Sequence, residues 1–352
     1  MTHPPVVLGL DFGGTKTAVA VCDLLGNKLA SVVVPSRGEL GAVASFGHGI
    51  ETARELLRST APDSRLAAVG AATFGIPFED RVELAPAIEG WGALRFGDEL
   101  QTAFPGVRVR MATDAKAAAR AESRWGALAG YDPAVYLNLG TGLASAIVIG
   151  GRVLAGGHGA AGEIAYNLRT LEDVGRELGQ RVMLENMVSG QALPERAVEA
   201  GLCRHGQSAA DIFLASRHDQ ALDDLIAEFV NELAFHLTNL AILVDPVRIA
   251  VGGGMVRSWD RIGPRLAQAL QVGVPFPPEL VVAHFPEDAP LLGAVALAVD
   301  AAGEGTIDGQ PLPEVDTHGS EEEQEQGARS WIPAGAGSAP AVSSTEESLP
   351  LA

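Results

Sequence analysis

The sequence predicts an α/β protein made of two related halves. Apolar strands alternate with helical patterns along most of the chain, which is typical of that class. The chain opens with three short strands joined by tight turns, over residues 6–12, 17–23 and 28–35, which favours an antiparallel meander over the strand-then-helix opening of a dinucleotide-binding fold. A strand-turn-strand pattern around Gly-Thr occurs at residues 11–21 and again at 138–149, which indicates an internal duplication.

The remaining elements are expected in the following places. Apolar runs predict strands over residues 66–74, 107–112, 134–139, 145–149, 152–155, 248–251 and 280–285. Helical periodicity predicts helices over residues 49–59, 96–104, 115–125, 171–200, 221–244 and 290–301. The composition then changes to Gly, Pro, Ser, Ala and Glu, so residues 303–352 are predicted to be a disordered, acidic, solvated tail.

Composition and charge limit the possible functions. Of the 352 residues, 47% are hydrophobic and 20% are charged, so we expect a packed core and exclude a chain that is disordered throughout. The net charge of -19 repels nucleic acid and anionic membranes, which bind basic patches. The start of the chain has no signal-peptide pattern, and no apolar run reaches the roughly 20 residues that span a bilayer. We therefore expect a soluble, cytoplasmic protein that binds neither nucleic acid nor membrane.

The first Gly-Thr turn has the residue types of a phosphate-binding loop. It consists of Asp11, Phe12, Gly13, Gly14, Thr15 and Lys16. The glycines let backbone N–H groups approach a polyanion closely, and the Thr15 hydroxyl adds a donor. Asp11, at the end of a strand, can hold Mg2+ directly or through water. On these residues alone, an ordinary hairpin turn with an acidic neighbour remains the alternative.

Two further glycine turns follow predicted strands. They are Gly140, Thr141 and Gly142 in the second half of the chain, and Gly252, Gly253 and Gly254 farther on. Each of them alone is a weak signal, because Gly-Thr-Gly is an ordinary hairpin turn. Together with the first turn they have the spacing of a split nucleotide cleft, in which the second turn holds the terminal phosphates from the opposite side.

Seven short motifs occur in a fixed order along the chain. They are DFGGTK at 11–16, TDAKAA at 113–118, LGTG at 139–142, GAAGE at 159–163, LENMVSG at 184–190, DPVRIAVGGG at 245–254 and LLGA at 291–294. This order resembles the ROK family, which comprises sugar kinases and sugar-responsive repressors of the two-lobed actin/hexokinase-type (ribonuclease H-like) ATPase fold.

The resemblance covers almost the whole folded part, from about Val6 to Ala298. It implies a small lobe of residues 1–113 plus 286–302 and a large lobe of residues 114–285. It also implies that the first two glycine turns hold the phosphates of ATP and that residues 252–255 lie against the adenosine.

By the same resemblance, Asp114 matches the catalytic base of the family. The residue types support this independently, because a carboxylate at a strand end that opens an Ala-rich helix can accept a proton from an attacking hydroxyl. The helix N-terminus keeps such a carboxylate ionised. Without the resemblance, an ordinary N-cap aspartate would be the better interpretation.

Glu163 and Glu185 match two glutamates that bind sugar hydroxyls in the family. Ionised carboxylates accept hydrogen bonds from vicinal hydroxyls well. For Glu185, a charge on a helix surface is the competing interpretation. Thr113 and Tyr166 occupy two further positions that contact the substrate in the family.

The chain departs from glucose-type members at positions that recognise sugar hydroxyls. Ala87 stands where an Asn is expected, and Thr113 and Lys116 replace the two Asn residues that flank the catalytic aspartate motif. Ala165-Tyr166 stands where Gly-His is expected. Residues 175–185 contain no cysteine, so the zinc site of those members is not expected here.

These observations predict an ATP- and Mg2+-dependent kinase, expected to be a homodimer, that phosphorylates a primary hydroxyl of a sugar-like ring. The altered pocket favours a C7-cyclitol such as valienone in antibiotic biosynthesis. A hexose or aminosugar 6-kinase (glucokinase or kanosamine kinase) is the alternative. A sugar-sensing ROK regulator is more remote, because Asp11 lies too near the start for a preceding DNA-binding domain. The residues expected to act in phosphoryl transfer also disfavour a sugar-binding pseudoenzyme.

Overall fold

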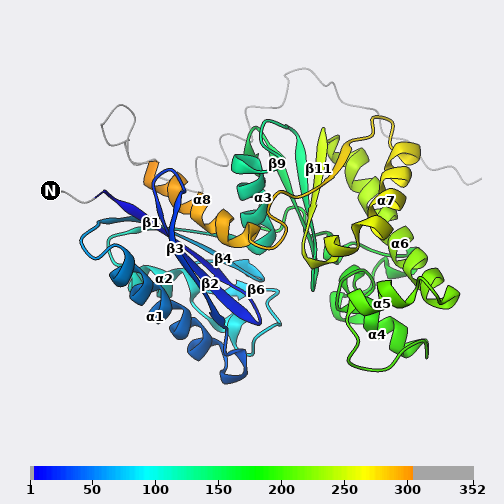
Figure 1. Ribbon diagram of the computed structural model, residues 1–352, viewed down its shortest axis with the longest axis horizontal. Coiled ribbons are helices and arrows are strands. Elements are labelled where there is room, and N and C mark those ends of the chain that lie inside the picture. The colour runs from blue at the N-terminus through cyan, green and yellow to red at the C-terminus, as the bar shows by residue number, and fades with distance from the viewer. Residues whose placement is uncertain (1–3, 304–352) are drawn as a thin grey trace, which may run out of the picture. The chain divides into compact units, whose positions relative to one another are not determined.

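Two five-stranded sheets with the same strand order form the framework of the protein (Figure 1). The structure is a computed structural model that describes residues 4–303. In each sheet, three antiparallel strands are followed by two parallel ones. The α/β class is therefore confirmed, and the two Gly-Thr turns do belong to two topologically equivalent halves.

The strands of the first sheet are β3 (Lys28–Pro35), β2 (Lys16–Asp23), β1 (Val6–Phe12), β4 (Leu66–Thr73) and β7 (Arg108–Thr113). Those of the second sheet are β10 (Arg152–Val153), β9 (Leu143–Ile149), β8 (Ala134–Leu139), β11 (Arg248–Gly252) and β12 (Glu279–Val282). A short hairpin is formed by β5 (Ile76–Pro77) and β6 (Val82–Glu83). The α-helices are α1 (Ala42–Thr60), α2 (Phe96–Ala103), α3 (Asp114–Trp125), α4 (Ala192–Glu199), α5 (Ala209–Ala215), α6 (Gln220–Val244), α7 (Trp259–Gly273) and α8 (Ala289–Gly303).

Helix α8 covers one face of the first sheet and crosses α3 (Figure 1). The contacts are very close: a Cβ on Gly293 of α8 would overlap the backbone of Ala117 in α3. A Cβ on Gly70 of β4 would likewise overlap the backbone of Ala294. Only glycine allows such an approach of two backbones, so these two glycines determine how α8 packs against α3 and β4.

An aromatic cluster covers the opposite face of the first sheet. Side chains alternate along β1, so Phe12 points to this face while its neighbour Asp11 points toward α8. The Phe12 ring stacks on Phe46 of α1 at 5.3 Å and meets Phe96 of α2 edge-on at 5.5 Å. Pairs of this kind contribute about 0.5–1.5 kcal/mol each beyond their burial. The aromatic cluster therefore fixes Phe12, which lies at the start of the first glycine turn.

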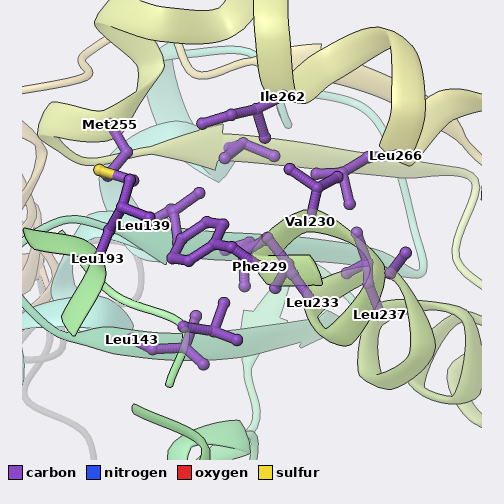
Figure 2. Close-up of a cluster of buried hydrophobic side chains, with 14 of the residues drawn as sticks. Leu139, Leu143, Leu193, Phe229, Val230, Leu233, Leu237, Met255, Ile262 and Leu266 are labelled. Atoms are coloured by element: carbon purple, nitrogen blue, oxygen red, sulfur yellow. The ribbon is translucent and has the colours of Figure 1, made fainter. Parts of the chain in front are cut away.

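The second sheet packs against α6 and α7 through a large aliphatic core. Figure 2 shows the centre of this core, where the labelled side chains are Leu139, Leu143, Leu193, Phe229, Val230, Leu233, Leu237, Met255, Ile262 and Leu266. Leu139 and Leu143 flank the second glycine turn, and both are buried. The residues on both sides of that turn therefore belong to the apolar core of the second half.

The helix predicted over residues 171–200 is wrong. Only α4 is α-helical there, and the rest consists of loops and short 3-10 turns at Leu171–Asp173, Leu178–Gln180 and Leu184–Asn186. Gly175 has φ 80°, which interrupts any helix. Leu171 and Val174 are exposed, so the apolar period of this segment does not face a core.

Other boundaries differ less. The helix predicted from residue 49 begins at Ala42, the strand predicted over 280–285 ends at Val282, and α5, α7 and the β5–β6 hairpin were not predicted. The tail predicted over 303–352 lies outside the described residues, except that Gly303 ends α8. The division into two lobes stays a prediction. No helix within residues 4–303 has the length and apolarity needed to cross a membrane.

Candidate active site

The first glycine turn joins β1 to β2 and is held from both flanks. The backbone N–H of Gly13 donates to the carbonyl of Lys16 at 3.0 Å, which closes the turn. After β3, the Ser36 hydroxyl donates to the carbonyl of Gly14 at 2.7 Å, and the Ser36 N–H donates to the carbonyl of Thr15 at 3.0 Å. The turn is thus fixed before any ligand arrives, as a phosphate-binding loop requires.

A groove of about 480 Å3 borders this turn. Gly14 and Ala87 both line it, and a Cβ on Gly14 would lie 3.2 Å from the Cβ of Ala87. The loop that carries Ala87 is anchored by Trp91, whose Nε1 donates to the hydroxyl of Thr73 at 3.0 Å. Ala87, which stands at the position of the expected Asn, therefore lies beside the first glycine turn, but its methyl group offers no hydrogen bond.

The second and third glycine turns lie against each other. Gly253 has φ 88°, and a Cβ there would come within about 2.5 Å of the backbone of Leu139, just before the second turn. The carbonyl of Gly140 accepts a hydrogen bond from the N–H of Gly190 at 2.7 Å. Nothing within 4 Å would meet a Cβ on Gly254, so open space remains beside this turn. The structure therefore brings together two of the three loops of the predicted nucleotide cleft.

Asp114 begins α3 directly after the last strand of the first sheet. The backbone N–H of Ala115 donates to Oδ1 of Asp114 at 2.7 Å. Burial raises the pKa of Asp114 to about 6; the Ala115 hydrogen bond and Lys116 oppose this shift, and the charges of Glu163 and Glu185 add to it. A carboxylate with this pKa is ionised at neutral pH yet basic enough to take a proton from a hydroxyl.

Tyr166 lies in the same electrostatic environment. Burial raises the pKa of its hydroxyl to about 12, and the charges of Glu163 and Glu185 contribute to that shift. The structure therefore brings Asp114, Glu163, Glu185 and Tyr166 together. Thr113 is adjacent, but its hydroxyl accepts a hydrogen bond from the N–H of Lys116 at 3.3 Å and caps α3.

Each of the two glutamates has a protein partner. Oε2 of Glu185 accepts a hydrogen bond from the N–H of Leu143 at 2.8 Å. Oε1 of Glu163 forms an ion pair with Nζ of Lys116 at 2.9 Å, which the sequence analysis did not predict. The loop that carries Glu163 is tied to β9, because the Ser145 hydroxyl donates to the carbonyl of Gly162 at 2.6 Å.

Asp11 lies at the start of the first glycine turn, and the charge of Asp114 acts on it. Burial raises the pKa of Asp11 to about 7; the charge of Asp114 adds to the shift, Lys16 opposes it and Asp288 adds to it. Within residues 4–303, no cluster of three or more His, Cys, Asp or Glu side chains could hold a metal ion alone. Carboxylates that raise one another's pKa are, however, the donors that a hard divalent cation prefers, so Asp11 fits a role as one of several Mg2+ ligands.

Glu122 is a buried carboxylate that the sequence analysis missed. It lies on α3, its side chain is fully inaccessible, and it accepts backbone hydrogen bonds from Ala127 at 2.6 Å, His284 at 3.1 Å and Phe285 at 2.7 Å. These bonds fix the segment between β12 and α8, which carries Asp288. No local sequence signal could have identified Glu122, because two of its partners are more than a hundred residues away.

Comparison with known proteins identifies the family to which the chain is similar and known structures that share its fold. The model of the ROK family matches residues 7–301. The bifunctional enzyme NanE/NanK of Brucella suis biovar 1 (strain 1330) is 29% identical over 303 residues, which cover 83% of this chain and 53% of that enzyme. The chain thus spans about half the length of this relative. The glucokinase of Streptomyces coelicolor is 28% identical over 320 residues, which cover 83% of this chain and 97% of the glucokinase.

Two crystal structures are similar along most of their length. The ROK hexokinase from Thermus thermophilus is 29% identical with a TM-score of 0.72, and the match covers 85% of this chain and 100% of that one. The ROK family glucokinase from Streptomyces griseus in complex with glucose and AMPPNP is 28% identical with a TM-score of 0.65, and the match covers 84% of this chain and 99% of that one. The predicted hexokinase-type fold class is therefore confirmed.

Proposed function

Because the chain belongs to the ROK family, we propose that it is an ATP- and Mg2+-dependent kinase that phosphorylates a primary hydroxyl of a sugar-like ring. The observation that carries the proposal is the position of Asp114. It lies at the start of α3, beside two glutamates suited to ring hydroxyls, and close enough to Asp11 of the first glycine turn for its charge to raise the pKa of Asp11. The similarity to a glucokinase that binds AMPPNP supports ATP as the phosphoryl donor.

In this reaction the acceptor ring binds between Glu163 and Glu185. Its hydroxymethyl oxygen attacks the terminal phosphorus of ATP, the bond from that phosphorus to the leaving ADP oxygen breaks, and the hydroxyl proton passes to Asp114. The pKa of Asp114, about 6, suits this proton transfer at neutral pH. The backbone N–H groups of the glycine turns at 13–15 and 140–142 would hold the phosphates. Asp11 would help to hold a Mg2+ ion, which would neutralise the charge that develops on the phosphoryl oxygens.

For the acceptor, we favour a C7-cyclitol such as valienone, phosphorylated at its exocyclic hydroxymethyl group. Ala87 cannot bond a hydroxyl, the Thr113 hydroxyl caps α3, and Tyr166 offers a flat ring with one polar tip. A site with fewer hydroxyl partners suits a ring with fewer hydroxyls and some planar character, because polar groups are then not left unpaired. A hexose or aminosugar 6-kinase remains the second candidate, supported by the similarity to glucokinases.

The test is ADP release measured over a panel of glucose, kanosamine, N-acetylmannosamine and valienone, with wild-type protein and the Asp114→Asn variant. We expect Mg2+-dependent ADP release that requires Asp114, with the highest kcat/KM for valienone. If no ring raises ADP release above that of the variant, the kinase proposal fails. If glucose is the best acceptor by a factor of about ten, the cyclitol assignment fails and the kinase assignment stands.

A further inference from the structure

A buried ion pair links Lys116, near the start of α3, to Glu163. Nζ of Lys116 lies 2.9 Å from Oε1 of Glu163, and the two side chains are 7% and 16% exposed. Lys116 follows Asp114 by two residues on α3, whereas Glu163 lies on the loop after β10. A buried ion pair is weak evidence for a purely stabilising role, because desolvation offsets most of its attraction.

This pair faces the groups that are expected to bind the acceptor. The charges of both Lys116 and Glu163 act on Asp114, and the charge of Glu163 also acts on Tyr166. Glu185 completes this set of charged neighbours. The pair therefore lies close to the residues that are expected to bind the acceptor.

The ammonium group of Lys116 retains hydrogen-bonding capacity. It carries three N–H donors, and Glu163 is the one hydrogen-bond partner of Nζ found within residues 4–303. A donor with no acceptor function favours a ligand oxygen that only accepts hydrogen bonds, such as a carbonyl. A ligand that places an ammonium group here would meet a like charge, which is costly in a site of low exposure.

Without Lys116, Glu163 would favour a ligand with an ammonium group over one with a carbonyl oxygen. An unpaired carboxylate in this position attracts an ammonium group, so it would favour an amino sugar. With Lys116 bound to it, that attraction is compensated within the protein. The residue at position 116 thus decides whether Glu163 presents an uncompensated negative charge to the ring, in addition to those of Asp114 and Glu185.

We propose that the Lys116–Glu163 pair is a specificity determinant that selects acceptor rings bearing a carbonyl oxygen and disfavours rings bearing an ammonium group. The inference rests on the proposed function, in that the ring binds beside Asp114. It narrows the substrate class to neutral rings that carry a carbonyl oxygen and separates this chain from kinases that act on amino sugars.

The experiment compares the binding of valienone with that of valienamine, which carries an ammonium group where valienone has its carbonyl. Isothermal titration calorimetry in the presence of AMPPNP gives both Kd values without requiring turnover. For the wild-type protein, we expect valienone to bind at least about tenfold more tightly than valienamine. Equal affinities, tighter binding of valienamine, or no binding of either ring would overturn the proposal.

Variants test whether position 116 is responsible. In Lys116→Gln, Glu163 is released and the preference for valienone should fall by about tenfold or reverse, whereas Glu163→Gln should strengthen it. Lys28→Gln, which removes the same charge from an exposed site on β3, is the matched control and should keep the wild-type ratio. An unchanged ratio in a folded Lys116→Gln protein would overturn the proposal. If that variant does not fold, Glu163→Gln tests the pair instead, and a preference for valienone that stays the same or falls in it would overturn the proposal.

Different results would refute the kinase proposal and the proposal about the Lys116–Glu163 pair. The kinase assignment depends on ADP release with any ring in the panel, whereas this inference depends on the ratio of two Kd values. An active kinase with no preference for valienone over valienamine would refute the inference alone.

Discussion

Oε2 of Glu185 accepts a hydrogen bond from the backbone N–H of Leu143 at 2.8 Å, immediately after the second glycine turn. One carboxylate expected to bind the acceptor is thereby fixed to the loop expected to hold phosphate. A Cβ on Gly142, the last residue of that turn, would overlap the same oxygen. The two expected binding sites consequently share one short contact, so we expect a change at one of them to affect the other.

Gly142→Ala should impair acceptor binding. The added methyl group displaces the carboxylate of Glu185, so we expect KM for the acceptor to rise about tenfold or more, in line with the loss of one charge-assisted hydrogen bond. Steady-state kinetics with each substrate varied in turn measures this. Gly157→Ala is the control, because nothing lies within 4 Å of a Cβ there. Unchanged kinetics in Gly142→Ala would mean that Glu185 does not contact the acceptor.

Asp114→Asn should lower kcat by about a hundred- to ten-thousand-fold, which is the usual contribution of a general base. The side chain keeps its shape but can no longer accept the proton. Because burial disfavours the charge of Asp114, the melting temperature should stay the same or rise. AMPPNP binding by calorimetry and kcat by ADP release are the two measurements. Near wild-type turnover would remove Asp114 from the mechanism.

The pKa of Asp114 predicts the acidic limb of the pH–rate profile. The base works only when it is ionised, and its pKa is raised to about 6 from an ordinary value of 3.8. With Mg2+ and ATP saturating, which would keep Asp11 ionised, log(kcat/KM) for the acceptor should therefore fall with unit slope below about pH 6. An unperturbed aspartate would sustain activity to about pH 4. Circular dichroism at each pH controls for unfolding, and a plateau that extends to pH 4.5 in folded protein would contradict the assignment.

Asp11→Asn should stabilise the free protein at alkaline pH. The folded-state pKa of Asp11, about 7, lies above its unfolded value, so the native state binds the extra proton and loses stability as the pH rises from about 4 through 7. Removing the charge should raise the melting temperature by a few degrees at pH 8 and by little at pH 4. Asp224→Asn, at an exposed carboxylate on α6, is the control. A lower melting temperature of Asp11→Asn at pH 8 would contradict this prediction.

Glu122→Gln should destabilise the fold. One carboxylate oxygen becomes an amide nitrogen, which cannot accept from the backbone N–H groups that Glu122 binds, so a buried donor faces another donor. We expect a loss of about 2–4 kcal/mol in the free energy of unfolding. Urea denaturation measures it, with Glu199→Gln at the exposed end of α4 as the control. A change below about 0.5 kcal/mol would mean that these hydrogen bonds are not needed.

The first sheet could be predicted because its strands carry their own signals. Apolar alternation and tight turns define β1 to β3 locally, and β1 and β3 have the predicted bounds. Residues 171–200 could not be predicted in the same way, because their apolar residues mimic helical spacing while several of them face solvent. Apolar periodicity alone cannot distinguish a helix that packs against a core from a loop whose apolar residues face solvent.

The candidate site was predictable in part. Asp114, Glu163 and Glu185 lie in recognisable motifs, and the structure brings them into electrostatic contact. The ion pair of Lys116 with Glu163 was not predictable, because the partners are 47 residues apart and the path of the connecting loop decides whether they meet. Sequence patterns identify reactive residue types, whereas the pairing of charges depends on tertiary structure.

Helix α8 is the last described element, yet it covers the sheet that the first described strand begins. Arg108 of β7 also donates to the carbonyl of Ala301 at 3.0 Å, across 193 residues of sequence. During translation, the apolar face formed by Val7, Ala20 and Ala68 therefore stays uncovered until the ribosome has released α8. Long-range closure of this kind slows folding and leaves apolar surface open to aggregation. A nascent chain stalled before Ala289 should consequently be retained by chaperones.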